Sequence, residues 1–321
     1  MHSPTTFLLA RFVCAVALAA LAGCDSGTAT AAAAATADTP KGEADAAPSP
    51  DASNAGDTAA SDAAASDTAA SDAAASDAAA FVLGDPPAGM VPLGVGQNGD
   101  LAVEVFAPAT PQAGQNYLAY RVTAQGVVTS AATITQAAQM QMAGAPHGCP
   151  LIDPPEAADS LGLFQSVAVF QMASAADDPW RLDLNVAVPL GAPTRKVSVD
   201  GLLVANSTWV TTATAADGSK SIVSLYFAKK PKVGLNSYVL SVHGNPADSD
   251  TFPAVADATV KATPLMVTMG HGSNGNVAPV AKGNGLYAGK ANFSMPGEWK
   301  LTFAVTAAGK SLGSAAFKIT L

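Results

Sequence analysis

The sequence is poor in the residue types and motifs on which catalysis commonly depends. It has three cysteines and four histidines among 321 residues, and charged side chains make up only 13%. No Gly-x-Ser-x-Gly, His-Glu-x-x-His or glycine-rich phosphate-binding motif occurs. Acidic residues after the first 80 positions are scattered, so no isolated pair is available as general acid and base. We therefore expect that the protein is not an enzyme.

The chain also lacks a surplus of basic residues. Its net charge is −9, and residues 1–80 account for most of it, with ten acidic and two basic side chains, a balance of −8. Residues 81–321 contain fifteen acidic and fourteen basic side chains, a balance of −1. A nearly neutral folded part offers no basic footprint for nucleic acid. We therefore expect no nucleic-acid partner.

No apolar run is long enough to form a finished transmembrane helix. Arg11 precedes a short apolar stretch, residues 12–20, which is too short for a ~30 Å hydrocarbon core but fits a signal peptide. The stretch leads into Leu21-Ala22-Gly23-Cys24, which resembles the lipobox of bacterial lipoproteins. The resemblance implies a signal peptide at 1–23 and a mature chain that starts at a diacylglycerol-modified Cys24. An ordinary signal peptide followed by a chance cysteine is the alternative.

Two or three acyl chains on Cys24 would give a stable anchor, since one chain alone binds a membrane only marginally. Membrane lipid is then one partner of the protein. We expect a location in the cell envelope, facing the periplasm or the cell surface, while the choice of membrane stays open.

Residues 24–85 form an Ala/Ser/Asp-rich segment with almost no large apolar side chain. Ser-Asp pairs recur every five residues, at positions 61–62, 66–67, 71–72 and 76–77. Such a segment has nothing to bury that would offset the entropy of ordering it, and its aspartates repel one another. An alanine-rich helix is the alternative, but a five-residue spacing fits no helix face, so we expect a disordered tether.

Removal of Cys14 with the signal and acylation of Cys24 leave Cys149 as the only free thiol. No internal disulfide is then possible, even in an oxidising compartment. Cys149 is expected to be either buried and inert or chemically employed.

The remaining chain is dominated by strand patterns. Apolar and polar residues alternate in segments separated by Pro, Gly and Asn, and no amphipathic helix lies between them. The clearest segments are Leu101–Phe106, Tyr117–Val122, Ser166–Phe170 and Arg181–Val186. This pattern predicts an all-β fold made of small antiparallel β-sandwiches.

One order of features occurs twice. It runs through two methionines, a histidine, an aromatic residue, Phe-x-Met and Trp-basic-Leu. The first copy has Met140, Met142, His147, Phe164, Phe170, Met172 and Trp180, and the second has Met266, Met269, His271, Tyr287, Phe293, Met295 and Trp299, with strand pairs around Tyr117 and Tyr238 before them. Pro189, Gly191 and Pro193 interrupt the alternation between the copies. Two tandem sandwiches are therefore expected, at 86–193 and 194–321.

The second copy carries a motif that can be matched to a family. Met-x-x-Met-Gly-His, Gly-x-Tyr and Phe-x-Met-x-Gly-x-Trp-x-Leu, over Leu265–Val305, resemble YtkA-like (FixH-related) domains. The first copy matches less closely, because its Met-Gly-His step is longer and Gly297 has no equivalent. The resemblance implies immunoglobulin-like sandwiches on exported or membrane-anchored bacterial proteins, and an association with copper handling and cytochrome oxidase assembly.

Methionine and histidine together form a soft donor set that suits copper, above all Cu(I). In the second copy Met269 and His271 have the same parity, and Met295 lies on a strand that returns toward them, so these three are candidate ligands. In the first copy the candidates are Met140, Met142, His147, Cys149 and Met172. The alternative is that the methionines are ordinary core residues, and Met266 and Met172 are the two most strongly expected in the core. Trp180 and Trp299 are expected as core residues, and His243 as the surface end of a strand.

Two functions follow from these patterns. The first is a membrane-anchored copper-binding lipoprotein, with a copper-receiving protein as its further partner. The second is a structural or adhesive module without metal, whose loops contact a partner.

Overall fold

The computed structural model describes residues 85–321 except for 141, 143–146, 155–156, 176 and 247–250. The signal peptide and all but the last residue of the tether predicted from the sequence lie outside these residues. Strands, turns and loops make up the part of the chain that the structure describes. No helix in that part is long and apolar enough to cross a membrane.

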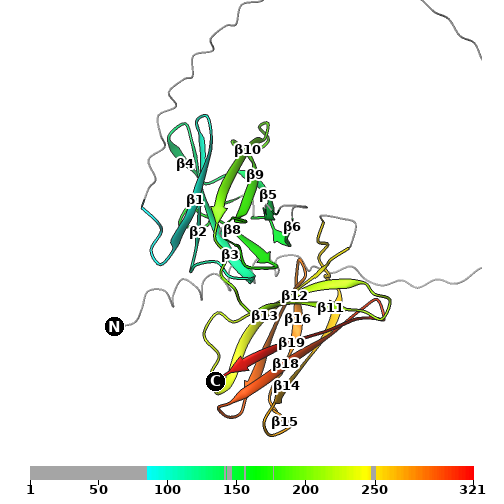
Figure 1. Cartoon of the computed structure of the whole chain (residues 1–321). Coiled ribbons are helices and arrows are strands. Elements are labelled where there is room, and N and C mark those ends of the chain that lie inside the picture. The colour runs from blue at the N-terminus through cyan, green and yellow to red at the C-terminus, as the bar shows by residue number, and fades with distance from the viewer. Residues whose placement is uncertain (1–84, 141, 143–146, 155–156, 176, 247–250) are drawn as a thin grey trace, which may run out of the picture. The chain divides into compact units, whose positions relative to one another are not determined.

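The first sandwich consists of two antiparallel sheets, drawn in cyan to green in Figure 1. One sheet has the order β1-β2-β3-β8-β7, with β4 paired to β3, and the other has the order β10-β9-β5-β6. The strands are β1 (Val91–Asn98), β2 (Leu101–Ala107), β3 (Gly114–Ala124), β4 (Val127–Thr129), β5 (Thr133–Met140), β6 (His147–Gly148), β7 (Leu151–Ile152), β8 (Phe164–Phe170), β9 (Trp180–Ala187) and β10 (Arg195–Leu202).

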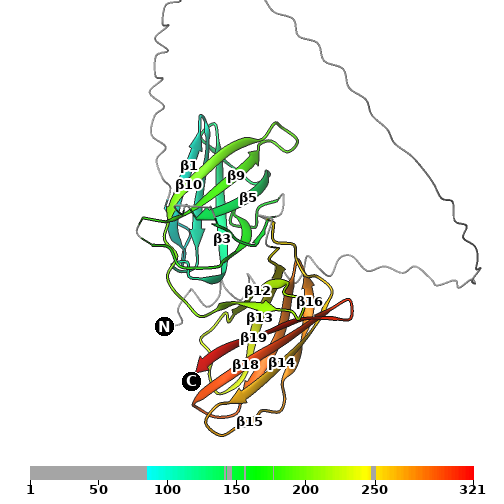
Figure 2. The same cartoon turned by 45° about the vertical axis from the view of Figure 1, so that its right-hand side comes forward.

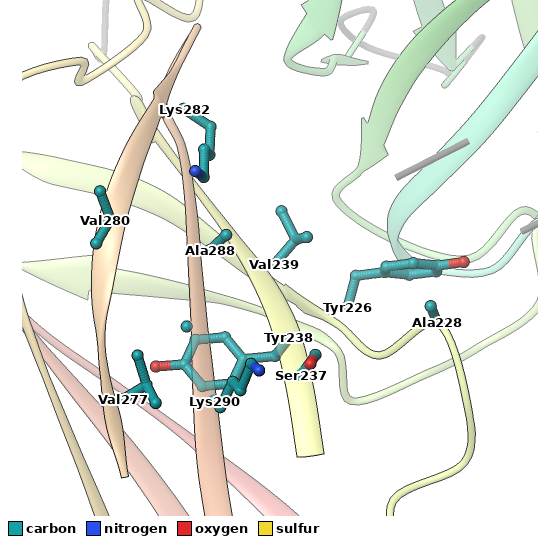
Figure 3. Close-up of a pocket in the computed structure, with 11 residues that line it drawn as sticks. Tyr226, Ala228, Ser237, Tyr238, Val239, Val277, Val280, Lys282, Ala288 and Lys290 are labelled. Carbon is teal, nitrogen blue, oxygen red and sulfur yellow. The ribbon is translucent and has the colours of Figure 1, made fainter. Parts of the chain in front are cut away.

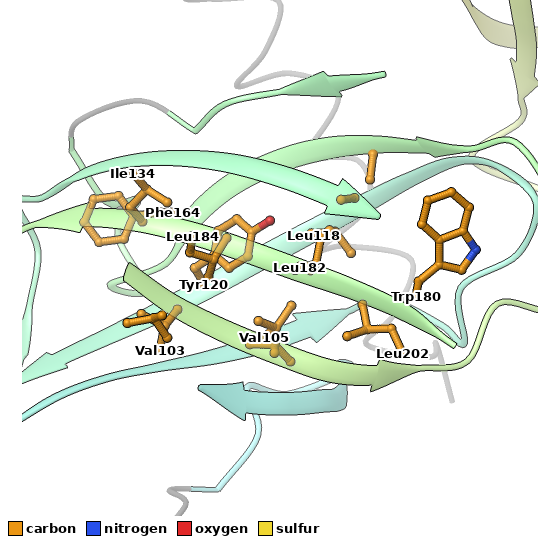
Figure 4. Packing of buried hydrophobic residues seen from close by; sticks show 14 of the residues in the cluster. Val103, Val105, Leu118, Tyr120, Ile134, Phe164, Trp180, Leu182, Leu184 and Leu202 are labelled. Carbon is orange, nitrogen blue, oxygen red and sulfur yellow. The ribbon is translucent and has the colours of Figure 1, made fainter. Parts of the chain in front are cut away.

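Alternation between buried and more exposed side chains is clearest along β9, whereas every residue of β2 is buried. Leu182 and Leu184 of β9 are fully buried and alternate with half-buried or exposed neighbours, as expected for strands with one face on a core. They meet Leu118 and Tyr120 from the opposite sheet in one hydrophobic cluster, as Figure 4 shows. The period of two that predicted the strands therefore also sets which side chains fill the space between the sheets.

The second sandwich also consists of two antiparallel sheets, drawn in yellow to red in Figures 1 and 2. Their orders are β11-β12-β13-β17-β16 and β15-β14-β18-β19. The strands are β11 (Val210–Thr214), β12 (Lys220–Tyr226), β13 (Gly234–Gly244), β14 (Ala258–Met266), β15 (His271–Gly272), β16 (Val277–Gly283), β17 (Leu286–Phe293), β18 (Glu298–Ala307) and β19 (Lys310–Thr320).

The two sandwiches have the same topology. Strands β11-β12-β13-β17-β16 repeat β1-β2-β3-β8-β7, and β15-β14-β18-β19 repeat β6-β5-β9-β10. In each, four strands of one sheet follow the A-B-E-D order and three of the other follow C-F-G, which is the arrangement of immunoglobulin constant-type domains. The predicted all-β fold of two immunoglobulin-like sandwiches is thus confirmed.

A shared turn fixes how the two copies align. The side-chain amide of Asn116 donates to the carbonyls of Gln112 and Gly114 and its Oδ1 accepts from the Gln112 amide. Asn236 makes the same three bonds one copy later. Counting from these asparagines, Tyr238 corresponds to Leu118, not to Tyr117, so the sequence comparison of the two tyrosines was one residue out of phase.

The first sandwich extends beyond the boundary predicted at 193. Strand β10 pairs with β9, with Val197 opposite Leu184 and Leu202 opposite Trp180, and its apolar residues belong to the first core. Figure 4 shows Leu202 beside Trp180. The cluster of Pro and Gly between 189 and 193 therefore turns the chain from β9 to β10 within one sandwich, and the second sandwich begins with β11.

Candidate metal site at the end of each sandwich

Three side chains line up across adjacent strands at one end of the second sandwich. Met266 ends β14, where it pairs with His271 of β15 on one side and with Trp299 of β18 on the other. Directly paired residues project to the same face of a sheet, and Met266 and Trp299 are both buried in the core. The imidazole of His271 contacts the indole of Trp299 edge-on, with 6.2 Å between ring centroids. The row runs from the core to the half-buried histidine.

The ring of His271 is held in one tautomer. Its Nδ1 lies 2.9 Å from the carbonyl oxygen of Gly272, and since a carbonyl only accepts, Nδ1 must donate. The other nitrogen, Nε2, is then unprotonated in the neutral ring and carries the free lone pair. Metal-binding histidines are typically oriented in this way, through a hydrogen bond from the nitrogen that does not bind the metal.

Met295 reaches the same end from the loop between β17 and β18. Its carbonyl accepts a hydrogen bond from Nε1 of Trp299 at 3.1 Å, and its half-buried side chain packs against the core that contains Met266. Gly297 follows in the same loop with φ +137, and a Cβ added there would lie 2.7 Å from the terminal methyl of Met266. The glycine therefore makes room for the Met266 thioether.

Met269 lies apart from this group. The parity argument from the sequence treated Met269 and His271 as members of one extended strand, but residues 267–270 form a turn that the Gly270 amide closes on the carbonyl of Met266. The Met269 side chain is 63% exposed. The residue that shares a face with His271 is its cross-strand partner, Met266, which the sequence analysis had placed in the core.

The first sandwich repeats the arrangement. Met140 of β5 pairs with His147 of β6 and with Trp180 of β9, and Nε1 of Trp180 donates to the carbonyl of Met172 at 3.2 Å. The phenyl ring of Phe170 packs on Trp180, as Phe293 packs on Trp299 in the second sandwich. Both copies thus present a buried methionine, a histidine and a tryptophan in one row.

The candidate ligands of the first copy are less well gathered. Met140 is buried, but His147 is exposed, and Met142 and Met172 are 39% and 36% exposed. Met172 is therefore not the core residue that the sequence predicted. The connection from Met142 to His147 runs through 143–146, which lie outside the described residues.

Cys149 is buried in the first core, where it is 4% exposed and unpaired. Burial raises the pKa of its thiol above the ordinary value, since a thiolate would lose its solvation there. The thiolate is the form that binds metals, so the buried environment disfavours the role of Cys149 as a ligand. Of the two roles considered for this residue, the structure favours a packed core thiol.

Across the described residues, no three His, Cys, Asp or Glu side chains come together. A metal centre at either end would therefore depend on thioethers as well as imidazole. In the second sandwich the donors present, two thioethers and one oriented imidazole, fit Cu(I), which prefers soft ligands. This donor set includes Met266 and omits Met269.

The other histidine and the two tryptophans complete the comparison with the sequence. Trp180 and Trp299 are fully buried, so their predicted core positions are confirmed. His243 was expected at the surface but is 2% exposed, because Ala254 bridges to it from the segment after β13 and Asn284 and Gly285 lie beside its ring. Alternation along β13 predicts that the His243 side chain points away from the core. It cannot predict that a segment distant in sequence covers that side chain.

No curated protein matches the sequence. Among solved structures, the chain is similar to the Escherichia coli adhesin FdeC, with 15% identity over 68% of this chain and 63% of that chain and a TM-score of 0.23. It is also similar to the Yersinia pseudotuberculosis adhesin InvE, with 12% identity over 71% and 60% and the same TM-score. The chain thus spans less than two thirds of either adhesin chain.

A family comparison is more specific. The model of YtkA-like domains matches residues 219–304, which run from the start of β12 into β18 and include Met266, His271, Met295 and Trp299. The second sandwich therefore matches the family that its sequence motif resembles.

Proposed function

We propose that the protein binds Cu(I) at the end of its second sandwich, through Nε2 of His271 and the thioethers of Met266 and Met295. The observation that supports this most directly is the row formed by Met266, His271 and Trp299, in which a hydrogen bond from Nδ1 leaves Nε2 free. Bound copper would supply a soft, redox-active cation, and the chain would hold and orient it. Delivery to a copper-receiving protein fits a site at the open end of the sandwich.

The test is a titration of the chain from residue 24, with Cys24→Ser, against a chromogenic Cu(I) chelator without oxygen. We expect the His271→Ala and Met295→Leu variants to weaken Cu(I) binding by at least about tenfold, because each removes one donor. Met269→Leu is the matched control, since it removes an exposed thioether from the same turn and should leave the affinity unchanged. Quenching of tryptophan fluorescence on copper addition, retained in a Trp180→Phe/Trp209→Phe variant, would report on Trp299, the remaining tryptophan.

Two glycine variants distinguish displacement of the Met266 thioether from the backbone strain that any residue other than glycine causes at positive φ. Gly297→Ala puts a methyl group where the end of Met266 lies, whereas Gly309→Ala, with φ +74, meets nothing within 4 Å. Both place alanine at positive φ, at a cost of about 1–3 kcal/mol. Only Gly297→Ala should also weaken Cu(I) binding. Equal copper affinity in both variants would remove Met266 from the site.

The competing function, a metal-free structural or adhesive module, predicts no Cu(I) uptake by the second sandwich at any protein concentration. It also predicts that the double variant His271→Ala/Met295→Leu behaves like the parent protein in every functional assay. Complete failure of the copper titration would therefore favour this function.

We also propose that the protein works outside the cytoplasm, anchored to a membrane through Cys24. The support is the apolar segment and lipobox-like motif at 12–24, in the part of the chain outside the described residues. In cell fractionation the parent chain should sediment with membranes, and Cys24→Ser should move it to the soluble extracytoplasmic fraction. An unchanged membrane fraction for Cys24→Ser would contradict acyl anchoring.

A further inference from the structure

The outer face of the β13-β17-β16 sheet carries a hollow that the copper proposal does not use. It has a volume of about 320 Å³, at the lower end of the range for small-molecule sites. Figure 3 shows Val239 from β13, Ala288 from β17 and Val277 and Val280 from β16 around it. All of these belong to the second sandwich.

The lining of the hollow is apolar where a solvent-facing sheet would normally be polar. Val277 and Val280 are 45% and 58% exposed, and Val280 pairs with Ala288, which in turn pairs with Val239. Three neighbouring strands thus present small aliphatic side chains in one row. An exposed apolar row of this kind, with polar groups at its rim, indicates a binding surface.

Charge at the rim is positive. Lys290 pairs with Val277 at one end of the row, and Lys282 lies two residues beyond Val280 toward the other. Neither ammonium group forms an ion pair with any described residue. Residues 205–321 contain ten basic and five acidic side chains, a balance of +5, while 85–204 contain four and ten, a balance of −6. The hollow therefore lies on the basic half of the molecule.

Tyr238 lies next to this row in sequence but on the other face of the sheet. It pairs with Gly289, between the outward residues Ala288 and Lys290, and its ring belongs to the core, with 5.3 Å between its centroid and that of Phe303 on β18. Recognition of charge at the hollow therefore depends on the two lysines.

We propose that this hollow binds a single-chain anionic amphiphile. The apolar chain lies along Val277, Val280 and Val239, and the carboxylate accepts a hydrogen bond from the Lys290 ammonium. Lys282 adds attraction from the other end of the rim.

The experiment is a calorimetric titration of the unlipidated chain (residues 24–321, Cys24→Ser) with dodecanoate below its micelle-forming concentration. We expect saturable binding with one site, weaker at high salt because the lysines are solvent-exposed. Acetate, which has the charge without the chain, and dodecyltrimethylammonium, which has the chain with the opposite charge, should not bind. Amide chemical-shift changes should be confined to β13, β16 and β17.

Lys290→Gln should weaken dodecanoate binding about tenfold, as expected for the loss of a charge-assisted hydrogen bond. Lys300→Gln is the matched control, since this exposed lysine lies on β18 in the opposite sheet and its loss should have no effect. Tyr238→Phe, on the core side of the same strand, should also leave binding unchanged. Equal effects of the two lysine variants, equal binding of the cationic amphiphile, or binding only to anionic vesicles and never to monomeric dodecanoate would each overturn the proposal.

Discussion

Replacing Trp299 with alanine should lower the free energy of unfolding of the second sandwich by about 3–5 kcal/mol. The indole is fully buried and contacts Phe293, with 5.5 Å between ring centroids. Its removal opens a cavity and leaves the carbonyl of Met295 without its donor. A sandwich of this size is stable by about 5–15 kcal/mol, so the loss would bring it close to unfolding.

Denaturant unfolding followed by far-UV circular dichroism measures this effect. Trp180→Ala should destabilise the first sandwich by a similar amount, because the two indoles occupy equivalent positions. Val267→Ala, at a half-exposed position in the turn that follows Met266, should change stability by less than about 0.5 kcal/mol. Trp299→Phe should fall between these limits. A loss for Trp299→Ala no larger than that for Val267→Ala would show that the indole is not a core residue.

Acidification should destabilise the second sandwich through His243. Burial lowers the pKa of this imidazole from 6.5 to about 4, and a backbone interaction at Asn284 offsets only part of the effect. Above pH 6.5 the ring is neutral in both states. Between pH 6.5 and about 4 the unfolded chain binds a proton that the folded chain does not, so the free energy of unfolding falls as pH falls. The full loss, reached below about pH 4, is about 3 kcal/mol.

The surroundings of His243 make this prediction specific. Its neighbours Ala254, Asn284 and Gly285 carry no charge, and its Nδ1 has no hydrogen-bond partner within the described residues. Apart from the backbone of Asn284, none of these neighbours compensates a proton on the ring. His243→Asn, which does not titrate in this range, should flatten the pH dependence of unfolding between pH 6.5 and 4. The same slope in parent and variant would assign the acid sensitivity to other groups.

Much of the architecture could be predicted from local sequence. Alternation gave the strands because each strand has one face on a core, and the repeated order of Met, His, Phe-x-Met and Trp gave the two copies because equivalent strands carry equivalent core residues. The domain boundary failed for a physical reason. Pro189, Gly191 and Pro193 interrupt a strand pattern in the same way whether the chain turns back into its own sheet or leaves the domain.

The sequence predicted a Met/His site in the second sandwich, but it included Met269 where the structure has Met266. Parity along the chain grouped Met269 with His271, but parity holds only within a continuous strand, and a turn separates these two. Pairing between strands, which brings Met266 opposite His271, depends on register and was not visible in the spacing. The basic hollow was missed because charge was pooled over both sandwiches, so that opposite balances cancelled.

The pairing of β10 with β9 decides how the protein can be divided. A fragment that ends at residue 193 would lack β10, the edge strand of the C-F-G sheet. The N–H and C=O groups of β9 that now pair with β10 would lose their hydrogen-bond partners. Unpaired edges with apolar inner faces invite association with other chains. The same cut would attach β10, with Val197, Val199 and Leu202, to the start of the other half, where it has no sheet to join. Separate production of the two halves therefore calls for a cut after Ala205, which still bridges to Gln112 of the first sandwich, in the short stretch before β11.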